Sequence, residues 1–594
     1  MADDPNTSAA ADPVALAARL VSLLPRLASA ISRASCRQLR EVTGVDYSMI
    51  DYQGVLEATG RFALAWWLDP LRALGAQAEL VARSLSLFEM HNDDKQRIQA
   101  SGRGVDKRFL DRAWSEDPTL AFARELYLFY AEWLLVQIRD CPALNDHDKQ
   151  KLAFYTRQLL CALAPTNMPL INPKVRTTAL ETHGESLVNG LQNLLHDLEQ
   201  GSGLFPITQN DPSAFVVGRN LAITAGKVIY RNDLMELIQY APRTDSVFRT
   251  PLLFVPPWIN KYYILDLQPE NSLFQWLIGQ GHTVFVISWA NPCERQAHKG
   301  LEHYLLEGPL QGIDVVRRIT GENEINLGGF CIGGILAVCA LAYLWAGGDV
   351  PVKSATCLAT MVDLTAVGDA AVFIDEAQLV NIERHTKRTG FLEGYHMKDM
   401  FSMMRENDLI WSYVINNYLL GRPPPAFDIL HWNADSTRLP ARMLTDFLRG
   451  IYMENSLVRP GRLRLAGRQI DLRSVRTPCY FLSTIEDHIA PWKATYPATQ
   501  ILSGPTAFVL GGSGHIAGVI NPPKKKKYGY WLADRYPASA DQWLKQAERH
   551  EGSWWPHCAR WLADYGGPTV APRQVGSNEF PPLADAPGEY VLAK

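Results

Sequence analysis

The sequence has few cysteines, and none of them are spaced as in metal sites or redox motifs. Nine cysteines are scattered over 594 residues, from Cys36 to Cys558, without a C-x-x-C pair. An odd, dispersed set of this kind argues against a disulfide framework and against a structural zinc site. We therefore expect reduced thiols, a cytoplasmic location and no bound metal.

An excess of charge of either sign is also lacking. Lysine and arginine number 58 against 62 aspartate and glutamate residues, which gives a formal net charge of −4. This balance produces no general field that would recruit nucleic acid, so we expect no nucleic-acid partner. The one dense basic run, Lys524 to Lys527, is typical of a solvated loop.

Long uncharged stretches are scarce, and residues 328–348 form one that could span a bilayer by length alone. Four of its first seven residues are glycine, and it ends in Gly347-Gly348-Asp349, a helix stop followed by a polar turn. We interpret it as a strand end, a tight turn and a buried helix. The start Met1-Ala2-Asp3-Asp4 is acidic, unlike a basic signal sequence. We therefore expect no transmembrane segment.

The first third of the chain has helical periodicity. Leucines recur at helical spacing over residues 14–31, and leucines and aromatic residues do so over 121–138. The first of these stretches is amphipathic, and either packs on its own protein or adheres to a hydrophobic surface. The composition changes at Gln200-Gly201-Ser202-Gly203. We therefore expect a mainly helical domain over 1–205 and a second domain over 206–594.

The second domain changes to short runs of β-branched and aromatic residues that alternate with helical segments. This alternation predicts an α/β fold, with a mostly parallel sheet covered by helices on both faces. An aromatic-rich helical stretch at about 365–445 interrupts the pattern, and we expect it to form a cap. The expected strands are 215–218, 227–230, 252–255, 283–287, one near 325, 354–361, 479–482 and 507–510.

A short motif follows the expected strand near residue 325. The run Gly329-Phe330-Cys331-Ile332-Gly333 has the G-x-C-x-G form of a nucleophile elbow with cysteine in place of serine. An elbow holds its central residue in a strained conformation, and the flanking glycines let strand and helix approach closely. The alternative is a buried, inert cysteine at the start of a helix.

Two further loops supply the partners that such a thiol needs. Asp487 follows the strand at 479–482, and His515 follows the strand at 507–510. Nucleophile, acid and histidine in this chain order, each after a strand, match an α/β-hydrolase. An imidazole raises the thiolate fraction of Cys331, and a carboxylate fixes the imidazole tautomer. Glu486 and His488 are local competitors that we rank lower.

Longer runs are more specific than the elbow. On these runs the chain resembles the polyhydroxyalkanoate synthases, in particular the single-subunit class I (poly-3-hydroxybutyrate) enzymes, from about residue 106 to the C-terminus. The runs are PPWINKYYILDL (256–267), WNAD (432–435), EDHIAPW (486–492), GHIAGVINPP (514–523) and GSWWP (552–556). The first 100 or so residues match least.

The resemblance implies an α/β-hydrolase-like catalytic domain with a helical cap, after a mainly helical N-terminal domain. It implies polymerisation of (R)-3-hydroxyacyl-CoA, short-chain units such as 3-hydroxybutyryl-CoA, into polyester with release of coenzyme A. Cys331 would carry the acyl group as a thioester, with His515 as general base and Asp487 as its partner. A thioester keeps the acyl group activated, which a serine ester would not.

The fold analogy also predicts binding contacts. The backbone N–H groups of Ile332 and Ile259 would stabilise the oxyanion. Trp432 would help to shape the substrate entrance, although packing is the alternative role. The reaction implies no cofactor, because coenzyme A leaves as a product. Expected partners are the acyl-CoA substrate, the growing chain, a second copy of the protein, and the polyester granule surface with its proteins.

Two rival functions remain open. A cysteine-dependent thioesterase of the same fold would use the same three residues and admit water. A noncatalytic coat protein of granules or membranes would fit the amphipathic N-terminal stretch, but it would leave the ordered Cys331, Asp487 and His515 without a purpose. Supplying 3-hydroxybutyryl-CoA separates the three, because polyester, free acid or no release of coenzyme A would result.

Overall fold

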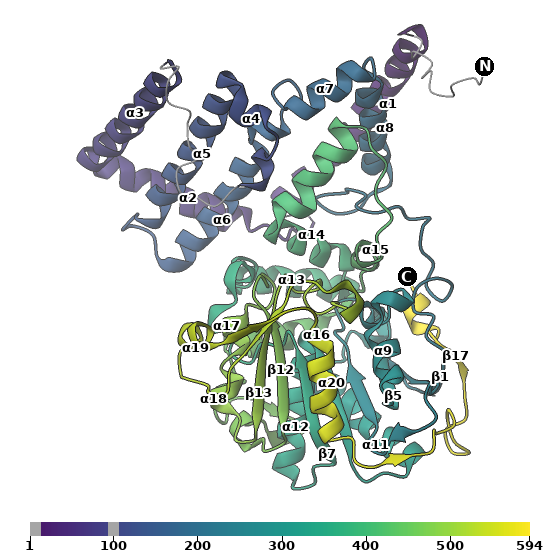
Figure 1. Cartoon of the computed structure of the whole chain (residues 1–594). Coiled ribbons are helices and arrows are strands. Elements are labelled where there is room, and N and C mark those ends of the chain that lie inside the picture. The colour runs from purple at the N-terminus through teal and green to yellow at the C-terminus, as the bar shows by residue number, and fades with distance from the viewer. Residues whose placement is uncertain (1–12, 45, 93–105) are drawn as a thin grey trace, which may run out of the picture. The chain divides into compact units, whose positions relative to one another are not determined.

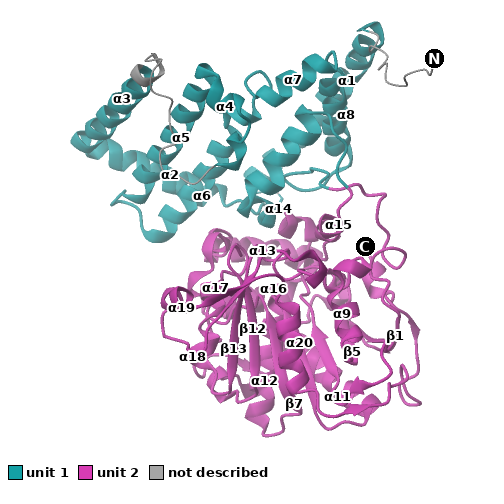
Figure 2. Ribbon diagram, in the orientation of Figure 1, with its two compact units in different colours: residues 1–209, 399–425 teal, residues 210–398, 426–594 magenta. Residues whose placement is uncertain are grey.

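The computed structural model describes residues 13–44, 46–92 and 106–594. The chain divides into two compact units (Figure 2). Unit 1 consists of residues 1–209 and 399–425, and unit 2 of residues 210–398 and 426–594. The acidic run Met1 to Asp4 lies outside the described residues.

Unit 1 is helical, as the periodicity predicts. Leu23 and Ala30 of its first helix are buried against Val188 and Leu195 of its last N-terminal helix, which confirms an amphipathic helix over 14–31. The helices before residue 201 are α1 (Pro13–Val42), α2 (Tyr52–Leu68), α3 (Pro70–Asn92), α4 (Ala113–Glu116), α5 (Pro118–Arg139), α6 (Asp146–Ala162), α7 (Pro173–Glu181) and α8 (Glu185–Gln200).

Helix α1 has a second property. Among the described residues it alone is long and apolar enough to cross a membrane by length and composition, which is weak evidence because core helices and signal sequences share these features. The stretch 328–348, in contrast, contains the buried helix α12 (Ile332–Gly347).

Unit 1 also takes residues from the stretch expected as a cap. Residues 399–425 begin within α14 (Gly394–Met404) and cluster with the N-terminal helices. The Tyr418 hydroxyl donates to Asp197 over 2.6 Å, and the Asn417 side-chain amide donates to the Thr208 carbonyl over 2.8 Å. These long-range polar contacts explain why this part leaves the expected cap, and sequence proximity gives no sign of them.

Unit 2 is built on an 11-stranded sheet (Figure 1). Its six central strands, from β13 to β5, are parallel, and antiparallel strands extend it at both edges. The order across the sheet is β15 (Glu548–His550), β14 (Tyr530–Leu532), β13 (Thr506–Gly511), β12 (Cys479–Thr484), β7 (Val352–Leu358), β6 (Ile325–Phe330), β4 (Leu252–Val255), β5 (Val284–Trp289), β2 (Met235–Tyr240), β1 (Gly226–Arg231) and β17 (Ala584–Asp585).

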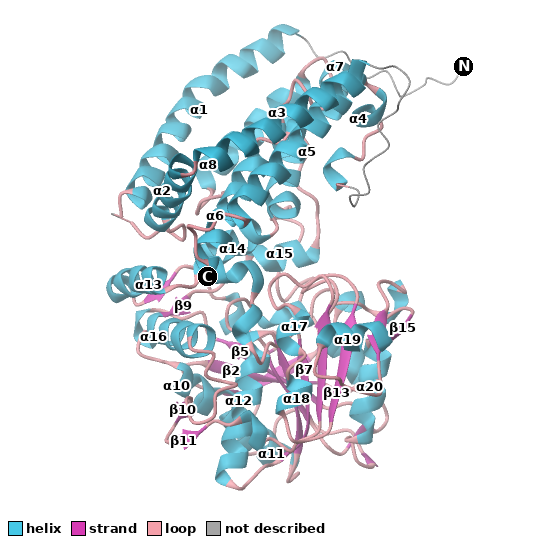
Figure 3. Cartoon of the chain, turned by 90° about the vertical axis from the view of Figure 1, so that its left-hand side faces the viewer, coloured by secondary structure: helices cyan, strands magenta, loops and turns pink. Residues whose placement is uncertain are grey.

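Helices cover both faces of this sheet (Figure 3). Helix α11 (Gln311–Thr320) packs on the Leu253 side, where a Cβ at Gly312 would lie 3.0 Å from that leucine. Helices α9 (Leu273–Gly279) and α20 (Trp555–Asp564) pack on the Phe254 side. Adjacent residues of a strand point to opposite faces, so the two sides are distinct layers of one α/β core.

The strand predictions are confirmed with one exception. Residues 215–218 form no strand; Val217 makes an isolated bridge with Leu221 across a turn. Strands β2, β14, β15 and β17 of the sheet were missed. In β2 the polar residues Glu236 and Gln239 interrupt the apolar run although both are buried. The cap within unit 2 includes α13 (Glu376–Thr389), α15 (Asp428–Ala434) and α16 (Ala441–Asp446).

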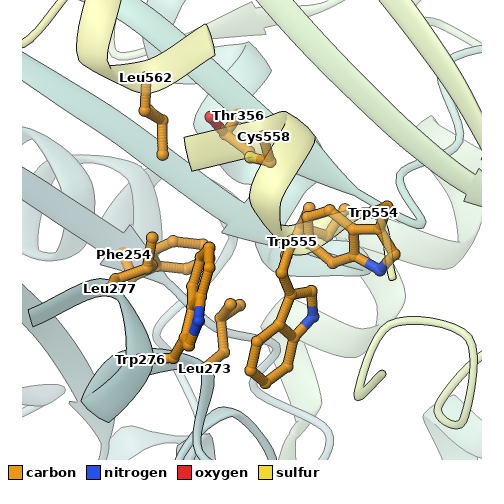
Figure 4. Close-up of a pocket in the computed structure, with 10 residues that line it drawn as sticks. Phe254, Leu273, Trp276, Leu277, Thr356, Trp554, Trp555, Cys558 and Leu562 are labelled. Carbon is orange, nitrogen blue, oxygen red and sulfur yellow. The ribbon is translucent and has the colours of Figure 1, made fainter. Parts of the chain in front are cut away.

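A small cavity lies between the sheet and α20 (Figure 4). Its lining is apolar apart from Thr356, and Cys331, Asp487 and His515 do not line it. We therefore treat it as a packing defect rather than as the reacting site. The lining residues are Phe254, Leu273, Trp276, Leu277, Thr356, Leu358, Trp554, Trp555, Cys558 and Leu562.

Candidate active site

The elbow has the expected strand-turn-helix geometry. Strand β6 ends at Phe330, Cys331 follows, and α12 begins at Ile332. Cys331 has φ +54° and ψ −126°, a conformation that costs a residue with a side chain about 1–3 kcal/mol. The Cys331 N–H donates to the Leu358 carbonyl of β7 over 2.8 Å. This bond to the neighbouring strand holds the strained residue, so the thiol lies at the carboxyl edge of the sheet.

Glycine is required at two positions of the elbow. A Cβ at Gly333 would lie 2.4 Å from the carbonyl oxygens of Val255 and Pro256. A Cβ at Gly329 would lie 2.6 Å from Cα of Gly334. Because real Cβ atoms do not approach backbone this closely, the glycines bring α12 against β6 and against the end of β4.

Asp487 and His515 meet at the same edge. Nδ1 of His515 lies 2.7 Å from Oδ2 of Asp487, and both side chains are almost completely buried. The other carboxylate oxygen accepts backbone N–H bonds from Ile489 at 2.9 Å and Ala490 at 2.8 Å. The carboxylate thus accepts one hydrogen bond from the imidazole and two from its own loop, and these three bonds fix the carboxylate plane.

His515 also contacts the elbow itself. Its ring stacks on Phe330 with centroids 5.3 Å apart. Burial lowers the pKa of His515, but the charge of Asp487, the charge of Cys331 and hydrogen bonds to both outweigh burial and raise that pKa to about 10. The three residues that the sequence selected are therefore in one cluster, and the imidazolium is stabilised when the sulfur is a thiolate.

The local competitor Glu486 is placed differently from Asp487. Glu486 is exposed, and its backbone N–H donates to the Ser513 carbonyl over 3.0 Å. That bond aligns the loop after β12 with the loop after β13. The carboxylate that contacts His515 belongs to Asp487.

The predicted oxyanion donors flank the elbow. Ile332 is the first residue of α12, where backbone N–H groups have no partner within the helix. Ile259 lies in the loop after β4, and Thr437 of the cap holds this loop. The Thr437 hydroxyl donates to the Trp258 carbonyl over 2.9 Å, and the Thr437 N–H donates to the Ile259 carbonyl over 3.3 Å. This placement suits the predicted role, which stays a prediction.

Trp432 supports the same loop. Its side chain is 5% exposed, and its indole N–H donates to the Lys261 carbonyl over 2.7 Å. The Lys261 ammonium pairs with Asp435 at 2.7 Å. Trp432 thus holds the loop that contains Ile259, and direct contact with substrate stays a prediction.

Sequence reasoning missed Tyr452. Burial raises the pKa of this phenol, and the charges of Cys331 and Asp487 raise it further, so the side chain is near both. No local motif marks it, because Cys331 and Asp487, whose charges act on it, lie 35 or more residues away in the chain.

Two family models match the chain, and their matches overlap at residues 250–277. Residues 105–277 match the family model described as the poly-beta-hydroxybutyrate polymerase (PhaC) N-terminus, and residues 250–522 match the alpha/beta hydrolase fold. A monoacylglycerol lipase structure from Paleococcus ferrophilus, 10% identical with a TM-score of 0.33, covers 56% of this chain and 99% of its own.

Curated relatives match most of the chain. The poly(3-hydroxyalkanoate) polymerase of Methylorubrum extorquens is 43% identical over 90% of this chain and 89% of its own. The polymerase subunit PhaC of Rhizobium meliloti is 42% identical over 89% of this chain and 87% of its own. The subunit PhaC of Cupriavidus necator is 42% identical over 84% of this chain and 85% of its own. Identity of this extent establishes that the chain belongs to the poly(3-hydroxyalkanoate) polymerase family of acyltransferases.

Proposed function

We propose that this protein polymerises short-chain (R)-3-hydroxyacyl-CoA, such as 3-hydroxybutyryl-CoA, into polyester through an acyl-Cys331 thioester. The observation that carries the proposal is the hydrogen bond between Asp487 and His515 beside a strained Cys331. The names of the curated relatives support the same reaction class.

Acylation begins from the thiolate of Cys331 paired with the imidazolium of His515. The sulfur attacks the thioester carbonyl, and the N–H groups of Ile332 and Ile259 stabilise the oxyanion. The C–S bond to coenzyme A then breaks, and His515 gives its proton to the departing thiolate. One thioester has replaced another, coenzyme A leaves as a neutral thiol, and His515 is left neutral.

Elongation uses the neutral imidazole that acylation leaves behind. Once Cys331 is acylated its sulfur has no negative charge, so one of the effects that raise the pKa of His515 is gone. The imidazole can then take the proton of a 3-hydroxyl group on the growing chain. The oxygen attacks the acyl-Cys331 carbonyl, an ester forms, and the thiolate and imidazolium are restored.

Asp487 acts in both steps through His515. Its carboxylate, held by two backbone N–H groups, keeps Nδ1 protonated and leaves Nε2 for the reacting atoms. The cycle needs no metal or prosthetic group, because coenzyme A arrives with the substrate and leaves as product.

A product assay tests this function. Purified protein is given 3-hydroxybutyryl-CoA, and free coenzyme A, insoluble polyester and free hydroxy acid are measured together. We expect coenzyme A and polyester in equal monomer equivalents. Free hydroxy acid in place of polyester would indicate a thioesterase, and no release of coenzyme A would indicate a noncatalytic coat protein.

We also propose that the protein works in the cytoplasm as a homodimer on the surface of its own polyester granules. Helix α1 supports granule attachment, because one face packs on α8 while apolar side chains of the other face are exposed. These include Val14, Val21, Leu24, Ile31, Leu39 and Val42.

Substitution of Val21 and Leu24 by serine tests the granule contact. The variant should remain in the supernatant when wild-type protein sediments with polyester particles, while release of coenzyme A in solution stays unchanged. Equal sedimentation of both proteins would contradict attachment through α1. Analytical ultracentrifugation with and without substrate tests the dimer, which a monomer at working concentrations would contradict.

A further inference from the structure

The cap returns to the sheet through a distorted helical segment. Residues Phe447–Met453, directly after α16, form a π-helical turn. Such turns are rare and are found frequently at functional sites. Tyr452 lies near the end of this segment and is half-buried.

One end of the segment is fixed to the loop after β4. The ring of Phe447 packs edge-on against Trp258 with centroids 5.2 Å apart. Tyr452 in turn packs against Phe447 with centroids 5.6 Å apart. Trp258 precedes Ile259, so this contact links Tyr452 to the loop that contains a predicted oxyanion donor.

The other end is fixed to the loop after β7. The side-chain amide of Asn455 donates to Asp363 over 2.8 Å, and its carbonyl oxygen accepts the Leu364 N–H over 3.0 Å. Asn455 has φ +47°, which asparagine tolerates better than most residues. These two hydrogen bonds of the Asn455 side-chain amide hold the turn in place.

These two anchors locate Tyr452 with respect to the nucleophile. Strands β4, β6 and β7 are neighbours with β6 in the middle, and all three are parallel. Their carboxyl ends therefore lie at one edge, with Cys331 at the end of β6. A segment fixed beyond β4 on one side and beyond β7 on the other passes over Cys331. The influence of the Cys331 and Asp487 charges on Tyr452 agrees with this position.

The Tyr452 phenol is suited to donate a hydrogen bond rather than to transfer its proton. Burial, followed by the two negative charges, raises its pKa, so it stays protonated near neutral pH. In the proposed reaction the thioester oxygen faces the backbone donors and the reacting hydroxyl proton goes to His515. None of these groups is assigned to the oxygen at position 3 of the acyl group that joins Cys331.

We propose that the Tyr452 hydroxyl donates a hydrogen bond to this 3-oxygen and so selects 3-hydroxyacyl groups over plain acyl groups. The assignment rests on the proposed function, because it presumes acyl transfer to Cys331. No bond is made or broken at Tyr452. It binds the substrate while Cys331 and His515 react.

The test compares two substrates that differ in one hydroxyl. Single-turnover acylation of Cys331 is measured with 3-hydroxybutyryl-CoA and with butyryl-CoA. In Tyr452→Phe, which keeps the ring, the rate with 3-hydroxybutyryl-CoA should fall about tenfold, while the rate with butyryl-CoA should equal that of the wild type. Tyr304→Phe is the matched control. Tyr304 packs on Trp258 as Phe447 does, and its loss of a hydroxyl should leave the ratio unchanged.

Each outcome bears on a different statement. An equal fall with both substrates, or no change with either, overturns the selection by Tyr452 while acylation of the wild type still supports the proposed function. A wild-type protein that is never acylated at Cys331 overturns the proposed function and this assignment together. Equal melting temperatures of the variants and the wild type establish that the ratio does not reflect unfolding.

Discussion

Nδ1 of His515 lies 2.7 Å from Oδ2 of Asp487, and the imidazole that this contact orients also interacts with Cys331. Replacing His515 by alanine removes the base for the thiol. We expect single-turnover acylation of Cys331 to fall about 10²–10⁴-fold. Rapid-quench measurement of coenzyme A release in one turnover checks this, and acylation at the wild-type rate would exclude His515 as the base.

Asp487→Asn should act unevenly on the two steps. Sulfur is intrinsically nucleophilic, so acylation should retain more of its rate than elongation, where an alcohol of high pKa depends on an oriented imidazole. Single-turnover acylation and steady-state polymer formation are measured on the same variant. An equal factor on both would mean that Asp487 serves the thiol equally or only holds its loop.

The titration of His515 should depend on Cys331. Because the negative sulfur favours the imidazolium, Cys331→Ala should lower the pKa of His515 from its value of about 10 in the wild type. NMR titration of ¹³C-labelled histidine measures the pKa of His515 in the wild type and in Cys331→Ala. The His515 peak is assigned as the one that is absent from the spectrum of His515→Ala. Equal pKa values in the two proteins would contradict the ion pair.

The same pair has a consequence for stability. The pKa of His515 is about 10 in the folded protein, above the ordinary value of 6.5. Its contribution to stability is therefore complete below pH 6.5 and is lost as the pH rises to about 10. In Cys331→Ala the pKa of His515 is expected to be lower, so this stability should be lost at a lower pH than in the wild type. Denaturant unfolding at several pH values measures it, with His515→Gln as the reference that lacks the titrating group.

Gly333→Ala should damage the elbow. Its Cβ would lie 2.4 Å from two backbone carbonyl oxygens, so α12 or the β4 loop has to shift, at a cost of about 1–3 kcal/mol typical of overpacked sites. In Gly333→Ala both the rate of acylation and the free energy of unfolding should be lower than in the wild type. Gly279→Ala is the control, since a Cβ there meets no atom within 4 Å, and equal stability and activity of both variants would contradict the close approach.

We expect the cap to move when substrate enters. Hydrogen exchange with and without a substrate analogue should differ over residues 365–398 and 426–445, the parts of the expected cap that belong to unit 2. Residues 399–425, which belong to unit 1, serve as the internal comparison. Strong and equal protection of the cap in both states would contradict its opening.

The elbow and the Asp487–His515 pair could be predicted because each depends on local sequence. Gly329 and Gly333 mark the close approach of strand and helix, and each partner follows a strand of apolar residues. The parallel sheet then brings loops that are distant in sequence to one edge. Local patterns and the rules of sheet topology were sufficient here.

Strand β2 could not be predicted, because its polar residues find partners far along the chain. Buried Glu236 accepts the N–H groups of Glu589 and Tyr590, each over 3.0 Å. Buried Gln239 accepts the Gly576 N–H over 2.8 Å. Periodicity treats both as exposed positions, and Tyr452 was missed for the same reason, since its role depends on anchors at Trp258 and Asp363.

The acyl group on Cys331 can be observed directly. Protein mixed with radiolabelled 3-hydroxybutyryl-CoA is quenched in acid within one turnover, digested, and analysed by mass spectrometry, with a parallel sample chased by unlabelled substrate. We expect the hydroxybutyryl mass on the peptide that contains Cys331, and passage of that label into polyester during the chase. Polyester formation without any acyl group on Cys331, or with the label on another residue, would contradict the proposed mechanism.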